Sequence, residues 1–218
     1  MNRPRSFVPA LGYRWLTGLY DPVMRLTMRE SLFKGALVAQ AKIRPRHDVL
    51  DLGCGTGTLT VLAARAEPMA RLAGVDLDDA VLRRARERAE RAGLPIDWER
   101  ASVDELPYAD ASFDRVLSSL LFHHLPPRAK ARALAEAFLV LRPGGELHLA
   151  DWGLPTGPVQ RALFLAVQGL DGFSNTRDHV AGRLPGFIQA AGFDQVAVRR
   201  RIRTIFGTVS LVSALRRH

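Results

Sequence analysis

An apolar run that ends in three glycines at alternate positions restricts the fold of this chain more than any other feature. Residues 49–58 read Val-Leu-Asp-Leu-Gly-Cys-Gly-Thr-Gly-Thr. Glycine lacks a Cβ, so the backbone can turn tightly after the strand and can approach a ligand closely. The spacing is G-x-G-x-G, whereas a dinucleotide site needs G-x-G-x-x-G to bring a pyrophosphate to a helix N-terminus. The loop therefore predicts a site for a zwitterionic amino-acid group, with its carboxylate near backbone N–H groups and its ammonium near Asp51.

Short apolar runs alternate with longer helical runs from residue 47 onward. This alternation predicts a parallel sheet with helices on both faces. The expected strands are 48–52, 71–76, 96–100, 113–118 and 146–151. The chain is expected to end with a helix at 180–191 and an antiparallel pair of strands at 195–203 and 208–214, joined through Phe206-Gly207.

Two helices have a clear apolar stripe. In the helix at 80–91, the spacing predicts that Val81, Ala85 and Ala89 share the buried face. After Pro126-Pro127, a second stripe is formed by Leu134, Phe138 and Leu141, and the Pro-Gly-Gly at 143–145 is expected to end that helix.

The second strand ends in an acidic residue. Gly74-Val75-Asp76 completes this strand, and a carboxylate at its carboxyl end can accept hydrogen bonds from both hydroxyls of a ribose. Asp78 is better placed than Asp76 to cap the following helix. We therefore expect Asp76 to bind a nucleoside.

Taken together, these segments resemble the class I S-adenosylmethionine-dependent methyltransferases, in particular the small-molecule group that includes the ubiquinone and menaquinone biosynthesis methyltransferases. The matching segments are DLGCGTG, GVDLDDAVLRRAR, ELPYADASFDRV, FHHL and LVLRPGGELHLADW. The resemblance implies an α/β, doubly wound, mostly parallel seven-stranded sheet with a reversed final strand. S-adenosylmethionine would lie across the carboxyl ends of the strands. The chain is then a single domain of residues 1–218, with a helical cap (1–45), a cofactor-binding core (46–152) and an acceptor-side helix with the final strands (153–218).

The resemblance also implies roles for individual residues. Asp51 and the three glycines would surround the methionine part, Asp76 would hold the ribose and Leu77 would flank the adenine. Relatives often have an Asp for the adenine amino group where this chain has Ser102, so either Ser102 or Asp104 is expected to make that contact. Ser119 and Leu120 would lie beside the sulfonium. The full set expected at the cofactor is Tyr20, Asp51, Gly53, Cys54, Gly55, Gly57, Asp76, Leu77, Ser102, Val103, Ser119 and Leu120.

Methyl transfer from a sulfonium needs in-line positioning and no metal, so no metal site is expected. A base is required only for an acceptor of high pKa, and His123 and His124 follow the fourth strand at the predicted active edge. An alternative is that this pair hydrogen-bonds the loop backbone before Pro126. Asp151, at the end of the fifth strand, is a further catalytic candidate, whereas His148 is expected to be packed inside that strand.

The acceptor is expected to be a small apolar or aromatic molecule that is quinone-like, polyketide-like or lipid-like. Residues 159–173 form an apolar segment, and Trp15, Tyr20 and Met24 give the N-terminal cap an apolar character. The cap could serve as a substrate lid or only cover one edge of the sheet. The same apolar residues could instead bury a dimer interface, so a monomer and a homodimer both remain open.

The charge of the chain raises one competing function. The formal net charge is +9, but the basic residues are dispersed, which favours a solvated surface over a nucleic-acid interface. An RNA methyltransferase and a non-catalytic S-adenosylmethionine-binding protein remain the alternatives. Cys54 is the only cysteine, which excludes an internal disulfide and a zinc cluster. With neither a signal core nor a run of about 20 apolar residues, we expect a cytoplasmic protein that does not insert into a membrane.

Overall fold

The computed structural model describes residues 29–154, 157, 160–161, 178–179, 181–205 and 207–217. The expected contributions of Trp15, Tyr20 and Met24, and of nearly all of the apolar segment 159–173, lie outside these residues. None of the helices that the structure describes is long and apolar enough to span a membrane.

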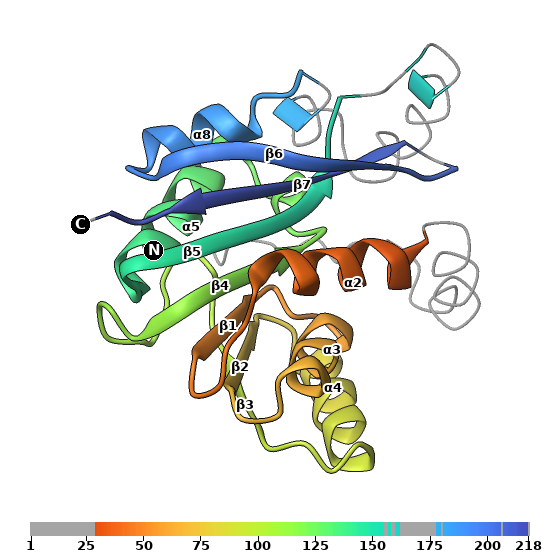
Figure 1. Cartoon of the computed structure of the whole chain (residues 1–218), viewed down its shortest axis with the longest axis vertical. Helices are drawn as coiled ribbons and strands as arrows, with labels where there is room; N and C mark the ends of the chain where they lie inside the picture. The colour runs from red at the N-terminus through yellow and green to blue at the C-terminus, as the bar shows by residue number, and fades with distance from the viewer. Residues whose placement is uncertain are drawn as a thin grey trace, which may run out of the picture.

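Seven strands form one sheet in the order β3-β2-β1-β4-β5-β7-β6 (Figure 1). The strands are β1 Asp48–Leu52, β2 Arg71–Asp76, β3 Ile96–Arg100, β4 Phe113–Ser119, β5 Leu141–Trp152, β6 Asp194–Arg203 and β7 Thr208–Leu215. Strands β1 to β5 pair in parallel, and β7 is antiparallel to both β5 and β6. The predicted mostly parallel, seven-stranded α/β sheet with a reversed final strand is therefore confirmed.

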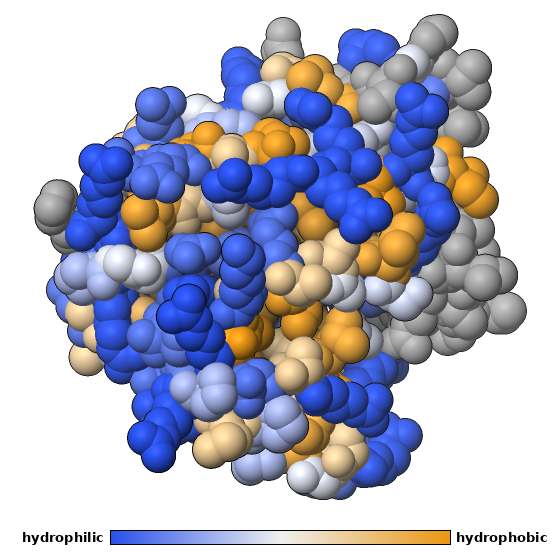
Figure 2. Space-filling model, in the orientation of Figure 1, coloured by the Kyte–Doolittle hydropathy of each residue, from blue (hydrophilic) through white to orange (hydrophobic). Residues whose placement is uncertain are grey.

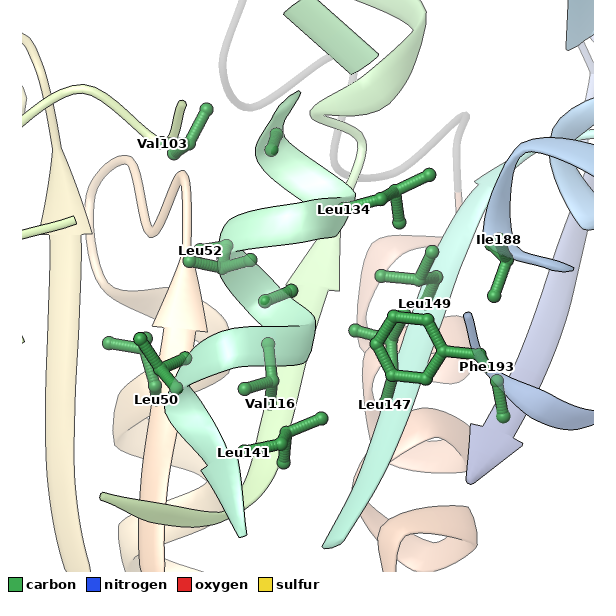
Figure 3. Close-up of a cluster of buried hydrophobic side chains, with 14 of the residues drawn as sticks. Leu50, Leu52, Val103, Val116, Leu134, Leu141, Leu147, Leu149, Ile188 and Phe193 are labelled. Carbon is green, nitrogen blue, oxygen red and sulfur yellow. The ribbon is translucent and has the colours of Figure 1, made fainter. Parts of the chain in front are cut away.

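Helices cover both faces of this sheet. They are α2 Glu30–Ala41, α3 Thr58–Ala66, α4 Asp79–Arg91, α5 Pro127–Val140 and α8 Leu184–Ala190, and a 3₁₀ turn spans Phe122–His124. One buried cluster packs α2 and α3 against the sheet, and a second packs α5 and α8 against the opposite face. Figure 3 shows the second cluster, in which Leu134 of α5 and Ile188 of α8 lie near Leu149 of β5. The two clusters give the doubly wound arrangement that the alternation of elements predicts.

The fifth strand begins earlier than the sequence predicts. Helix α5 ends at Val140, so Leu141 starts β5 and does not complete the helical stripe. The Pro-Gly-Gly at 143–145 continues the strand because Gly144 N donates to Arg216 O at 2.7 Å and Arg216 N donates to Gly145 O at 2.9 Å. The pairing of β4 with β5 shifts register in this region. A strand partner about 70 residues away along the chain thus overrides the local turn signal.

Two helix predictions also need correction. In α4 the fully buried residue is Leu82, with Ala85 and Ala89, whereas Val81 is only half-buried. Helix α8 begins at Leu184, so the expected start at residue 180 was too early. The cap of α4 is as expected, since Asp78 Oδ1 accepts a 2.7 Å hydrogen bond from Ala80 N.

Charged side chains are spread over most of the surface of the described residues. On the face shown in Figure 2, hydrophilic and apolar residues are interspersed. The main exception is the edge strand β6, where Arg199, Arg200, Arg201 and Arg203 are exposed. Charged side chains on an edge strand oppose pairing with a second sheet, which accounts for this run.

Candidate functional site

The candidate site lies at the carboxyl ends of the central strands. Strand β1 lies between β2 and β4, and β5 follows β4, so the loops after these four strands open at one edge of the sheet. The order of strands reverses between β1 and β4, and ligands of open α/β sheets bind at such a switch point. The edge brings together the glycine loop, Asp76, Ser119 and Asp151.

The three glycines of the loop after β1 all adopt left-handed backbone angles. Their φ values are 63° at Gly53, 54° at Gly55 and 71° at Gly57. A Cβ on Gly53 would meet Leu121 Cδ1 at 2.6 Å, and a Cβ on Gly57 would meet Trp98 Cη2 at 2.6 Å. Nothing lies within 4 Å of a Cβ on Gly55. Packing thus requires glycine at 57, the left-handed backbone favours it at all three positions, and the backbone at 55 is open to a ligand.

Asp51, the last but one residue of β1, is a buried carboxyl group with one unused oxygen. It is 1% exposed, and its Oδ2 accepts a 2.6 Å hydrogen bond from Thr60 Oγ1. Oδ1 has no hydrogen-bond partner among the described residues. Burial raises the pKa of Asp51 to about 7. Such a group can accept a charged donor, for example an ammonium, which would favour its ionised form.

Asp76 ties the end of β2 to the glycine loop. Its Oδ2 accepts a hydrogen bond from Gly55 N at 2.9 Å, and its Oδ1 accepts one from Asp78 N at 3.0 Å. Each carboxylate oxygen can accept more than one hydrogen bond, so the same carboxylate can also receive a diol. The adjacent Leu77 is 44% exposed, which leaves its side chain accessible to a flat apolar group.

The predicted residues around 102 form a small polar network. Ser102 Oγ donates to Asp104 Oδ1, and Arg132 Nε lies 3.0 Å from Asp104 Oδ2. The hydroxyl of Ser102 and the guanidinium of Arg132 lower the pKa of Asp104. The Ser102 hydroxyl oxygen and the Asp104 carboxylate both keep lone pairs that can accept a further hydrogen bond. Val103 packs in a core cluster, so its side chain faces the protein interior.

Cys54 is held inside the loop. Its thiol is buried, and burial raises its pKa, which keeps it protonated and unreactive. Cys54 N donates to Val75 O at 2.9 Å, and Gly57 N donates to Cys54 O at 2.9 Å. The residue therefore shapes the loop through its backbone.

Asp151 organises the second half of the site. This carboxylate is 1% exposed. It accepts hydrogen bonds from Phe122 N at 2.7 Å, His123 Nδ1 at 2.8 Å and Trp152 N at 2.7 Å. Burial alone would raise its pKa, but the nearby imidazoles of His123 and His179 and the hydrogen bonds from His123 and Trp152 N lower it. Asp151 is thus ionised and fixes both the end of β5 and the turn after β4.

The adjacent histidines occupy different environments. His123 is buried, at 3% exposed, and its Nδ1 hydrogen-bonds the Asp151 side chain. Asp151 in turn accepts a hydrogen bond from the loop backbone at Phe122 N. The His124 ring lies 3.9 Å from the His123 ring, centroid to centroid. Burial lowers the pKa of His124 to about 3, so this imidazole is neutral and a poor base at pH 7. Leu120, between the strand and this turn, has a left-handed φ of 55°.

A second group of polar residues lies beside Asp151, and no role for it was expected from the sequence. His179 is 1% exposed, and its Nδ1 lies 3.0 Å from Trp152 O and 3.7 Å from Asp151 Oδ1. The neighbouring Asp178 lies 3.4 Å from the fully buried Lys130 Nζ. One signal was available for Lys130, because it falls in register with the buried Ala133 and Ala137 of α5.

The remaining predicted residues are accounted for as follows. Tyr20 lies outside the described residues. His148 is buried within β5, as expected, with Nε2 3.1 Å from Glu146 Oε2. In the part of the chain that the structure describes, no three His, Cys, Asp or Glu side chains are grouped so that they could hold a metal ion.

Comparisons with known proteins identify similar sequences and folds. A family model described as a methyltransferase domain matches residues 49–145. The chain is 36% identical to 27-O-demethylrifamycin SV methyltransferase of Amycolatopsis mediterranei over 142 residues, 64% of this chain and 48% of that protein. It is 35% identical to the ubiquinone/menaquinone biosynthesis C-methyltransferase UbiE of Bordetella avium over 132 residues, 60% of this chain and 51% of that protein. The matches thus span about half the length of these curated relatives.

Among solved structures, the apo form of the S-adenosylmethionine-dependent methyltransferase SibL superposes with a TM-score of 0.67. It is 25% identical, and the match covers 86% of this chain and 55% of that chain.

Proposed function

We propose that the protein is an S-adenosylmethionine-dependent methyltransferase that transfers the cofactor's methyl group to a small apolar or aromatic acceptor, since residues 49–145 match a methyltransferase-domain model. The domain match and the methyltransferase relatives support the family, the enzyme class and the cofactor that the motifs predict for this part of the chain. The identity of the acceptor and the roles of single residues belong to the proposal.

The observation that carries the proposal is the junction between the glycine loop and Asp76. Gly55 N donates to Asp76 Oδ2 at 2.9 Å, and Gly55 has open space where a side chain would otherwise stand. We assign the methionine part of the cofactor to this loop, the ribose to Asp76 and the adenine to Leu77 and Ser102. The unused Oδ1 of Asp51 is assigned to the cofactor's ammonium.

Bound S-adenosylmethionine would supply an electrophilic methyl group. The protein's part is then to hold the acceptor in line with that methyl, because proximity and orientation supply much of the acceleration of such a reaction. Asp151 and the turn at Phe122–His124 lie on the β4–β5 side of the glycine loop, and we place the acceptor there.

The acceptor class is supported by similarity and by apolar side chains at this edge. The curated relatives include a ubiquinone/menaquinone C-methyltransferase and a demethylrifamycin methyltransferase. Leu121, just after β4, is an apolar side chain that is only half-buried, whereas the neighbouring Phe122 and Trp152 are buried in the two core clusters. A quinone-like, polyketide-like or lipid-like molecule fits this chemistry.

Calorimetric titration with S-adenosylhomocysteine and with NADH tests the proposal. We expect the wild-type protein to bind S-adenosylhomocysteine and not NADH. Loss of a charged hydrogen-bond acceptor typically costs about 1.5–3 kcal/mol, so Asp76→Ala should weaken binding roughly 10-fold to 100-fold. The control Asp97→Ala removes an exposed carboxylate from β3 and should bind like wild type. NADH binding, or equal affinity in Asp76→Ala and wild type, would contradict the proposal.

Cofactor binding should also release a proton from Asp51. The pKa of its carboxyl is raised to about 7, so the group is largely protonated below that pH, and an ammonium favours the ionised form. The affinity for S-adenosylhomocysteine should therefore rise with pH, by at most about tenfold per unit, and level off above about pH 7. Titration in buffers of different ionisation enthalpy measures the released proton directly. In Asp51→Asn the pH dependence should vanish; a dependence that survives this substitution would assign the proton to another group.

Two further outcomes separate the alternatives. Tight S-adenosylhomocysteine binding without methyl transfer to any phenol, hydroquinone or polyketide supplied would favour a non-catalytic binding protein. RNA affinity that falls steeply with salt and is lost when the arginines of β6 are replaced would favour an RNA methyltransferase.

A further inference from the structure

We propose that His179 binds the methyl acceptor and takes the proton from its nucleophilic hydroxyl group. This inference rests on the proposed methyl transfer and deepens it, because it names the kind of acceptor atom and the residue that receives its proton.

The hydrogen bond at one ring nitrogen fixes the tautomer of His179. Nδ1 lies 3.0 Å from the carbonyl oxygen of Trp152. A carbonyl oxygen can only accept, so Nδ1 carries the hydrogen and donates it. In the neutral ring, Nε2 then carries a lone pair and no hydrogen.

This lone pair is buried and unused. Nε2 is one of three buried side-chain atoms without a hydrogen-bond partner within the described part of the chain. A buried acceptor without a donor costs about 1–3 kcal/mol, and such atoms are rare in folded proteins unless they serve another purpose. A hydroxyl group of a bound molecule would satisfy Nε2.

The position of His179 matches the acceptor side of the site. Its partner Trp152 ends β5, next to the end of β4 that leads into the turn at Phe122–His124. The His179 ring lies 6.2 Å from the His123 ring, centroid to centroid. His179 is therefore at the edge of the sheet where the loops of the cofactor site open.

The preceding residue anchors His179 from two sides. Asp178 Oδ2 lies 3.4 Å from Nζ of the fully buried Lys130, and Asp178 Oδ1 lies 2.5 Å from Arg183 Nη2. A buried lysine is costly unless it is paired, so the Lys130 ammonium holds Asp178 against α5. The backbone adds two bonds, from Gly182 N to His179 O at 3.0 Å and from Arg183 N to Asp178 O at 2.8 Å.

The proton balance of the step is complete with these groups. The hydroxyl oxygen forms a bond to the methyl carbon, and the carbon–sulfur bond breaks with its electron pair going to sulfur. The hydroxyl proton passes to Nε2 of His179. The imidazolium so formed has Nδ1 3.7 Å from the ionised Asp151, which stabilises its charge. Burial lowers the pKa of His179, which leaves the ring neutral before the reaction, and the nearby Asp151 carboxylate opposes this shift by favouring the protonated ring.

The other histidines of the site are less suited to this role. Burial holds His124 neutral with a pKa of about 3, which makes it a weak base. His123 directs Nδ1 to Asp151 at 2.8 Å and thereby positions the carboxylate that faces His179.

Nitrogen-15 NMR of histidine-labelled protein tests the inference without knowledge of the natural acceptor. In the complex with S-adenosylhomocysteine at pH 7, we expect His179 to show a protonated Nδ1 and a bare Nε2. The probes are a series of simple phenols and hydroquinones, together with their methyl ethers. At least one hydroxyl compound should shift the Nε2 resonance, whereas its ether, which has no donor, should not.

Two variants then separate the roles of the two ring nitrogens. His179→Asn keeps an N–H for Trp152 O and removes Nε2, so turnover of the responding phenol should fall about 100-fold or more. His179→Gln keeps an acceptor near Nε2 without its basicity, and should bind that phenol within a few-fold of wild type but turn it over as slowly as the Asn variant. His47→Asn, a histidine before β1, is the control.

The outcomes distinguish this inference from the function on which it rests. If S-adenosylhomocysteine does not bind, the proposed function is wrong. If it binds but Nε2 is protonated, or no hydroxyl compound shifts it, only the role of His179 is overturned. Should either variant fail to fold, the tautomer and the probe shifts of the wild-type protein still decide.

Discussion

Gly57→Ala is expected to destabilise the protein by about 2–5 kcal/mol. Alanine at a φ of 71° takes a left-handed conformation that costs about 1–2 kcal/mol. Its Cβ would also stand 2.6 Å from Trp98 Cη2 and 3.0 Å from Ala85 Cβ, and overpacking of this kind costs about 1–3 kcal/mol. Both atoms belong to packed elements, β3 and α4, so neither can move away freely. Urea unfolding followed by circular dichroism measures the loss.

Gly55→Ala is the matched control. Its φ of 54° carries the same left-handed strain, but its Cβ would meet nothing within 4 Å. We expect it to cost only the strain, about 1–2 kcal/mol, and to fold. Because the open space at Gly55 is where we place the cofactor, this variant should lose affinity for S-adenosylhomocysteine at least tenfold. Equal destabilisation in the two variants would show that packing against Trp98 and Ala85 is not what requires glycine at 57.

The strands whose bounds are set by neighbouring residues could be predicted from the sequence. Strands β1, β2 and β3 have the bounds expected from the sequence, and for β1 and β2 the reason is local, because each is a largely apolar run ended by a glycine or an acid. The start of β5 could not be predicted, because the bonds from Gly144 and Gly145 go to Arg216. No local pattern reveals a partner so far along the chain.

The phase of α4 shows a second kind of limit. Val81, Ala85 and Ala89 have helical spacing, but so do Leu82, Ala85 and Ala89, and the structure buries the latter set. The choice between Val81 and Leu82 depends on how the helix rotates over β2 and β3, which is a tertiary property. The sequence pattern alone makes two adjacent faces of the helix nearly equal in apolar character.

The two halves of the candidate site also differ in how far local sequence predicts them. The glycine loop and Asp76 could be predicted because a βα turn and a strand end are local features with specific residue requirements. The group around Asp151 could be predicted only as separate residues. His123 and Asp151 meet because β4 and β5 are neighbours, and His179 joins them through a pair, Lys130 with Asp178, that is 48 residues apart in sequence.

Removal of the Asp151 carboxylate tests whether that group acts as one unit. Asp151→Ala would leave Phe122 N, Trp152 N and His123 Nδ1 without their acceptor in a buried place. Breaking a buried charged network typically costs about 3–5 kcal/mol, so this variant should unfold at a markedly lower urea concentration at pH 7. Asp151→Asn keeps one carbonyl oxygen as an acceptor but turns an N–H₂ group toward the same donors. It should therefore lose somewhat less stability than Asp151→Ala.

The pH dependence of stability identifies the charge as the cause. The folded pKa of Asp151 lies below the value of about 3.9 for an unfolded aspartate, so its contribution to stability is fully present above about pH 4 and is lost as the pH falls toward the folded pKa. Wild type should therefore lose more stability than Asp151→Asn between about pH 5 and pH 3. Asp97→Asn, which alters an exposed carboxylate of β3, should keep the wild-type slope. Asp151→Asn could instead show the same dependence of stability on pH as wild type. The three N–H groups would then bind a neutral oxygen equally well, and a protonated His179 would have no ionised partner.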